Sequence, residues 1–170
     1  MKRTIIFAAI LALGAQSFAQ QNPLMPVNMN IRGGFVYPLE DATRNFTGNM
    51  FGIGLDFNTN VSLVKGGMGY LSLDYAAKSI GGNKNTFVSV MYNQRFPLGY
   101  NKTTETSTYY FAGVGISFID VTTSKSVLGV RGGVGADLST NIFAEMTLTF
   151  SGNANGAKAN TVGVFVGYKF

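Results

Sequence analysis

The 170-residue sequence contains no cysteine, no histidine and no tryptophan. Without cysteine it has no disulfide, no thiolate metal ligand and no thiol nucleophile, and without histidine it lacks the commonest general base and metal ligand. Charged residues are also scarce, at 12% of the chain, whereas roughly one quarter is usual for soluble domains. These absences exclude most hydrolytic and zinc chemistry, so neither a metal nor a cofactor is expected.

The first 19 residues are interpreted as a cleaved secretory signal peptide. Lys2 and Arg3 provide a basic start, residues 5–13 are apolar, and residues 17–19 (Ser-Phe-Ala) have the small-x-small form of a cleavage site. An apolar run of about ten residues is too short to span a bilayer as a helix. Cleavage removes two of the 13 Lys and Arg residues and leaves 11 against 8 acidic residues, so no nucleic-acid ligand is expected.

After a lead-in over residues 20–27, the chain alternates with the period of two that is typical of β-strands. Clusters of glycine, asparagine, serine and threonine separate the apolar runs, and helical spacing is not sustained anywhere. We therefore predict a single all-β domain over residues 28–170. Its eight strands are expected at Asn28–Tyr37, Met50–Asn58, Gly67–Ala77, Thr86–Phe96, Thr108–Ile119, Ser126–Leu138, Ile142–Ser151 and Asn160–Phe170.

The two faces of these strands differ in chemistry. One face carries bulky apolar residues such as Ile53, Val90 and Leu148, and the other carries glycine, small polar residues and the charges. The charged residues of the predicted strands are Arg32, Asp56, Asp74, Arg95, Arg131, Asp137, Glu145 and Lys169. A glycine-rich face in water would weaken the strands without any packing gain, whereas the interior of a narrow barrel needs small residues. The bulky face is therefore expected to meet lipid, where a basic residue at the bilayer midplane costs about 2–4 kcal/mol.

Strand number, strand length and aromatic placement all fit an eight-stranded antiparallel up-and-down transmembrane β-barrel. Strands of about 9–11 residues match the span of a tilted transmembrane strand, and closure leaves no sheet edge in lipid. Outward aromatic residues gather near the strand ends, as in the girdles at the two membrane interfaces. One rim has Tyr37, Phe51, Tyr75, Phe118 and Phe150, and the other has Phe57, Phe96, Tyr110, Tyr168 and Phe170.

With its signal peptide, period of two, girdles and terminal aromatic residue, the sequence resembles the small outer-membrane barrels of the OmpX/OmpA transmembrane-domain type (outer membrane protein beta-barrel domain). The resemblance covers the whole mature chain. It implies a monomer in the bacterial outer membrane, surrounded by outer-membrane lipid, with both termini in the periplasm and four external loops. Tyr168 and Phe170 resemble the C-terminal signal that the barrel-assembly machinery recognises. The predicted periplasmic turn Pro97–Ser107 is longer than those typical of this family.

Because isolated charges in a confined lumen are costly, the eight charged residues are expected to form ion pairs or to be hydrated. A turn centred on Thr140 places Glu145 opposite Gly135 and too far from Arg131 for a direct pair, so Arg32 across the barrel is a candidate partner. The favoured interpretation is a rigidifying plug, since an eight-stranded barrel has little room beyond its own side chains. The alternative is a switchable gate in a narrow conduit.

The predicted external loops carry cations that could meet lipopolysaccharide phosphates. Acidic residues such as Glu40, Asp41 and Asp120 dilute this charge, and ordinary solvated loop charge is the favoured interpretation. The cations are Arg44, Lys78, Lys84, Lys125 and Lys158.

A non-enzymatic protein of the cell envelope is expected. Paired carboxylates such as Asp56 and Asp74 could support acid–base chemistry, but no nucleophile–base pair accompanies them. The chain also differs from the barrel lipid A acylases, deacylases and proteases, because small outer-membrane enzymes typically use histidine and this chain has none. The expected role is structural or surface-interacting, around a charge-paired polar lumen. One alternative is a porin-like narrow channel for water, ions or a small solute, and another is a secreted soluble ligand-binding barrel.

Overall fold

The computed structural model describes residues 29–59, 61–78, 85–101, 106–120, 124–154 and 158–170. The predicted signal peptide and lead-in, residues 1–27, lie outside this part of the chain. The described residues form eight strands and one short helix. Their bounds are β1 Met29–Pro38, α2 Asp41–Thr47, β2 Met50–Asn58, β3 Met68–Lys78, β4 Thr86–Asn101, β5 Thr106–Asp120, β6 Ser124–Asp137, β7 Ile142–Ser151 and β8 Thr161–Lys169.

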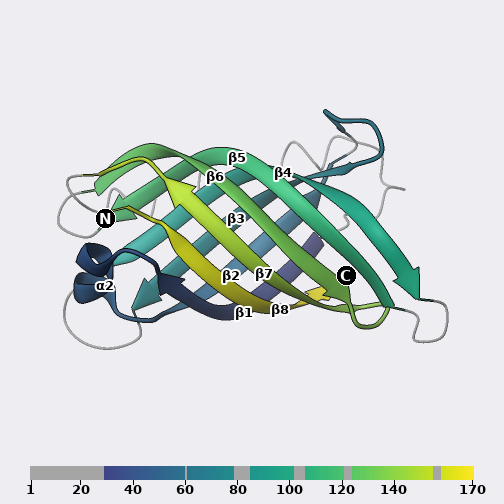
Figure 1. Ribbon diagram of the computed structural model, residues 1–170, viewed down its shortest axis with the longest axis horizontal. Coiled ribbons are helices and arrows are strands. Elements are labelled where there is room, and N and C mark those ends of the chain that lie inside the picture. Colours follow the sequence, from purple (N-terminus) through teal and green to yellow (C-terminus); the bar gives the residue numbers. More distant parts are fainter. Residues whose placement is uncertain (1–28, 60, 79–84, 102–105, 121–123, 155–157) are drawn as a thin grey trace.

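Each strand pairs antiparallel with its neighbour along the chain, and β1 also pairs with β8, so the sheet closes into a barrel (Figure 1). The predicted eight-stranded antiparallel up-and-down barrel is confirmed. Two rims are distinguished below. At the α2 rim β1 ends and β2 begins, next to helix α2, and at the terminal rim β1 begins and β8 ends.

Two strands, β2 and β7, have the predicted bounds, and most other strand ends lie within two residues of prediction. The long turn predicted over Pro97–Ser107 is wrong. The ladder between β4 and β5 shifts register between Pro97 and Gly99, because proline has no amide hydrogen to donate, and pairing then resumes to Asn101↔Thr106. The β4–β5 hairpin therefore extends past the other strands at the terminal rim (Figure 1).

The segment between the first two predicted strands contains a short helix that the sequence pattern did not indicate, since residues 41–47 form α2 between β1 and β2. Thr43 and Thr47, four residues apart, are fully buried on one face, and the Thr47 hydroxyl donates to the Thr43 carbonyl over 2.9 Å. Gly48, at φ 59°, ends the helix in the left-handed region that glycine tolerates. Seven residues are too few for a helical period to stand out in the sequence. None of the helices in the described residues is long and apolar enough to cross a bilayer.

The outward face of the barrel exposes bulky apolar side chains over all eight strands. Phe35 on β1 is 72% exposed and Leu128 on β6 is 76% exposed. Away from the strand ends, the described strands carry no charged residue on this face. In water this would be an apolar surface far larger than monomeric soluble proteins display.

Candidate functional site in the barrel lumen

The structure places all eight predicted charged residues on the lumen face, in two separate groups. A central group, called the charge cluster below, comes from six different strands. Its members are Arg32, Asp56, Asp74, Arg95, Arg131 and Glu145. Lys169 and Asp137 form the second group at the terminal rim, where Lys169 Nζ lies 2.6 Å from Asp137 Oδ1. The Ser107 hydroxyl donates to Asp137 Oδ2 over 2.8 Å.

Arg32 lies at the centre of the charge cluster, and its side chain is 1% exposed. Its Nη1 lies 2.6 Å from Asp56 Oδ2 and 3.3 Å from Glu145 Oε2, and its Nη2 lies 2.5 Å from Asp74 Oδ1. The guanidinium also lies 5.4 Å from the ring centroid of Phe165. A planar guanidinium with five donors is suited to bridging several carboxylates, which a lysine ammonium cannot do in a fixed geometry.

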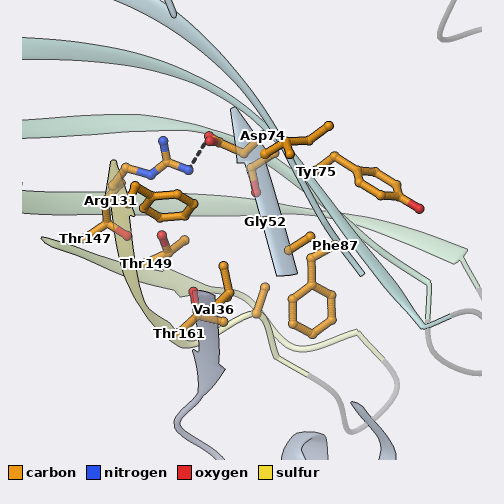
Figure 2. A pocket seen from close by; sticks show the side chains of 14 residues that line it. Val36, Gly52, Asp74, Tyr75, Phe87, Arg131, Thr147, Thr149 and Thr161 are labelled. Carbon is orange, nitrogen blue, oxygen red and sulfur yellow. Dashed lines mark hydrogen bonds and ion pairs between the residues drawn. The ribbon is translucent and has the colours of Figure 1, made fainter. Parts of the chain in front are cut away.

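Arg131 and Arg95 complete the cluster on its two sides. Arg131 Nη2 lies 2.5 Å from Asp74 Oδ2 (Figure 2), and Arg131 Nη1 donates to the Ser72 hydroxyl over 3.0 Å. Arg95 Nη2 lies 3.4 Å from Glu145 Oε1, and the Arg95 guanidinium stacks 4.0 Å from the ring centroid of Tyr109. Three guanidinium groups thus face three carboxylates, so the charge is balanced where water is scarce.

Tyr109 provides a further hydrogen bond to the cluster, because its hydroxyl donates to Glu145 Oε1 over 2.9 Å. Every carboxylate of the cluster therefore contacts at least one arginine, and Glu145 contacts two arginines and one phenol. Carboxylates held in this way are poor candidates for proton transfer to a substrate. No group of three potential metal ligands occurs among the described residues.

Large side chains also fill the lumen face, which corrects the expectation of a small and polar interior. They include Phe87, Met91, Tyr109, Phe111, Phe143 and Phe165, all buried. Tyr109 is the register partner of Gly135, and Phe143 is the register partner of Gly167. A Cβ atom at either glycine would clash with the partner's ring, so each glycine makes room for a neighbouring aromatic side chain.

The sequence contained a signal for these missed residues. Phe143 is two residues from Glu145, and Tyr109 is four residues from Gly113, so both share the phase of the lumen residues already identified. Side chains alternate between the lumen and the outside along each strand. A residue's position in that alternation, rather than its size, therefore indicates which side it faces.

Two hollow spaces lie on either side of the charge cluster. Toward the α2 rim there is a cavity of about 40 Å³, bordered by Asp74 and Arg131 and by apolar and threonine side chains (Figure 2). A larger vestibule of about 670 Å³ opens at the terminal rim, next to Tyr70, Arg95 and Lys169. A buried apolar group, called the apolar cluster below, lies around the small cavity on the same side of the charge cluster. Its members are Val36, Met50, Ala76, Phe87, Ile119, Ala154, Ala159 and Phe165. A solute entering the vestibule would therefore meet first the charge cluster and then this apolar cluster.

The predicted girdle residues lie on the outward face. At the terminal rim, Phe96 stacks on Tyr110 with ring centroids 5.0 Å apart, and Tyr168 meets Phe170 edge-on at 5.1 Å. At the α2 rim, Phe51 meets Phe35 edge-on at 6.3 Å. Aromatic side chains that pack together at both ends of the strands are typical of the two interfaces between a membrane and water.

The predicted loop cations are not gathered into one patch. Arg44 pairs with Asp41 within α2 and donates to the Tyr37 hydroxyl, and Lys158 Nζ lies 3.0 Å from Glu40 Oε1. Lys78 and Lys125 are exposed near strand ends at the α2 rim. Lys84 lies outside the described residues.

No family model and no curated protein sequence matches the chain. Several solved structures match in fold. A crystal structure of Ail, the attachment invasion locus protein of Yersinia pestis, shares 16% identity over 86% of this chain and 100% of Ail, with a TM-score of 0.52. The backbone structure of Ail in a phospholipid bilayer nanodisc gives 16% identity over 85% of this chain and 100% of Ail, with a TM-score of 0.50.

The N-terminal β-barrel domain of Pseudomonas aeruginosa OprF gives a similar match, with 14% identity over 84% of this chain and 97% of that domain and a TM-score of 0.52. At such low identity these likenesses concern the fold. The chain has the fold of the small eight-stranded outer-membrane barrels of the OmpX/OmpA type.

Proposed function

We propose that this chain is an integral, monomeric, non-enzymatic barrel of the bacterial outer membrane with a structural or surface-interacting role in the cell envelope. The observation that carries the proposal is the exposed bulky apolar face around a closed ring whose charges are paired inside. Such an apolar surface is stable when it is surrounded by membrane lipid. The fold shared with Ail, one of whose structures was determined in a phospholipid bilayer nanodisc, supports the same location.

Three partners belong to this proposal. Outer-membrane lipid contacts the outward face, and lipopolysaccharide lies near the exposed Lys78 and Lys125 at the α2 rim. The barrel-assembly machinery reads the C-terminal strand through Tyr168 and Phe170, whose side chains are 46% and 65% exposed. Segments at the α2 rim are then the surface available to partners outside the cell.

Fractionation of Gram-negative cells expressing the chain tests the location. We expect the protein in the outer-membrane fraction, shortened by the 19 residues of the predicted signal peptide. Unboiled and boiled samples should migrate differently on a denaturing gel, because a closed barrel keeps its hydrogen-bonded ring in detergent until it is heated. A soluble periplasmic protein without a gel shift would contradict the proposal and favour a secreted ligand-binding barrel.

The charge cluster and the apolar cluster predict that the barrel does not conduct. We expect no discrete current steps when the purified barrel is added to a planar lipid bilayer, because ions would have to cross a region of buried, fully paired charges and then an apolar layer. Current steps in the wild-type chain that change on Glu145→Gln would instead establish a narrow channel, since Glu145 links Arg32 to Arg95.

A further inference from the structure

Gln94 is a polar residue on the outward face of β4, between the outward residues Tyr92 and Phe96. It is only 6% exposed, because the β2–β3 turn folds over it. Its side-chain nitrogen donates to the Val64 carbonyl over 2.6 Å and to the Ser62 hydroxyl over 2.7 Å. Its side-chain oxygen accepts a hydrogen bond from the Val64 amide over 3.1 Å. A polar group that would be costly on a lipid-facing wall is thus satisfied by the turn.

The segment that covers Gln94, residues 61–67, is called the docked turn below. It lies outside the wall, next to β4 (Figure 1), and the Tyr92 hydroxyl holds it there by donating to the Val61 carbonyl over 2.7 Å. The close approach requires Gly69, because a Cβ atom there would clash with the Val61 carbonyl. Gly66, at φ 88°, allows the tight return of the chain.

The docked turn leaves its apolar side chains exposed, while its polar groups bond within the turn and to Gln94. The Ser62 hydroxyl bonds to the Val64 and Gly67 carbonyls, each over 2.8 Å. Val61, Leu63 and Val64 are 58%, 73% and 55% exposed, and Lys65 beside them is exposed too. This is not a general property of the terminal rim, since the β6–β7 turn there has the polar sequence Ser139-Thr140-Asn141.

The exposed apolar side chains are continuous with the aromatic girdle. Phe57, Leu71 and Tyr92 are successive register partners on the outward face of β2, β3 and β4, and Tyr92 holds the docked turn. The docked turn therefore begins at the same height along the barrel as the aromatic girdle, which is expected to lie at the lipid headgroups. Apolar side chains next to one exposed lysine fit that boundary, where the chain of the lysine can lie along lipid while its ammonium meets phosphate.

We propose that the docked turn is a membrane anchor that inserts Leu63 and Val64 into the headgroup boundary of the phospholipid leaflet at the terminal rim. The inference rests on the proposed outer-membrane location. It adds a segment outside the strands to the lipid-contacting surface, and it gives Gln94 and Tyr92 the role of holding that segment against the wall.

Single-tryptophan variants test the anchor, because the chain has no tryptophan of its own. Leu63→Trp reports on the docked turn, Val130→Trp on the middle of the lipid-facing wall and Ser139→Trp on the polar turn at the same rim. Each variant is reconstituted into vesicles of phosphatidylethanolamine and phosphatidylglycerol, with and without brominated phosphatidylcholine, and its gel shift on boiling is checked. Val64→Trp serves as a second reporter if Leu63→Trp does not fold.

We expect brominated lipid to quench Leu63→Trp by about half or more of the effect on Val130→Trp, with blue-shifted emission and weak quenching by aqueous acrylamide. Ser139→Trp should show the opposite behaviour. If Leu63→Trp behaves like Ser139→Trp while Val130→Trp is quenched by lipid, the anchor is wrong and the proposed location stands. If lipid does not quench Val130→Trp either, the proposed membrane location itself fails.

Discussion

Replacing Arg32 by methionine is expected to lower the free energy of unfolding of the barrel by about 3–5 kcal/mol, the cost of removing one partner from a buried ion pair. Arg32 contacts three carboxylates, and its loss leaves Asp56 and Glu145 buried with less positive charge beside them. Arg131 still contacts Asp74, and Arg95 still contacts Glu145. Asp56 loses the cation that the described part of the chain places against it, so its carboxylate carries most of the penalty.

The matched control is Lys169→Met, which breaks the other lumen ion pair. The side chains of Lys169 and Asp137 are 23% and 21% exposed at the vestibule, so water can solvate the remaining carboxylate. A change of no more than about 1 kcal/mol is expected there. Equilibrium unfolding in urea, followed by the conversion of the folded gel form to the form seen after boiling, measures both variants. Equal effects of the two substitutions would mean that burial does not control the strength of these pairs.

The central part of the fold could be predicted because each strand repeats one local pattern. Arg32, Asp56 and Glu145 each occupy the phase opposite to bulky apolar residues, and a period of two is enough to place all three on one face of a sheet. The short turn at residues 139–141 also determined register, and the predicted pairing of Gly135 with Glu145 is confirmed. Short connections leave little freedom of register, so pairing follows from the sequence near them.

Features that depend on contacts between distant segments could not be predicted in this way. Helix α2 is one example, because Thr43 is buried against the Lys158 carbonyl, more than one hundred residues away in the sequence. The docking of residues 61–67 on Gln94 is another example, since the sequence of neither segment indicates a contact with the other. At Gln94 the only local signal is a polar residue that interrupts the bulky outward phase of β4.

Replacing Gly34 by alanine is expected to prevent closure of the barrel, whereas the same change at Gly33 is expected to be tolerated. Gly34 lies on β1, where β1 pairs with β8 to close the ring. A Cβ atom at Gly34 would clash with the Val164 carbonyl and crowd the Phe165 backbone, and backbone cannot rotate away as a side chain can. At Gly33 the nearest atom to an added Cβ is Phe51 Cζ at 3.6 Å, an ordinary van der Waals contact.

We expect Gly34→Ala to lower the free energy of unfolding by more than about 3 kcal/mol, the upper range for overpacking. Gly33→Ala should change it by no more than about 0.5 kcal/mol. A ring that does not close leaves β1 and β8 as unpaired edges, which have no partner in lipid. Folding into detergent micelles, measured as the fraction that acquires the heat-sensitive gel shift, should therefore be nearly complete for Gly33→Ala and nearly absent for Gly34→Ala. Equal folding of the two variants would show that the β1–β8 ladder can move to accept a methyl group. The seam would then be a compliant part of the barrel rather than the place where its closure is decided.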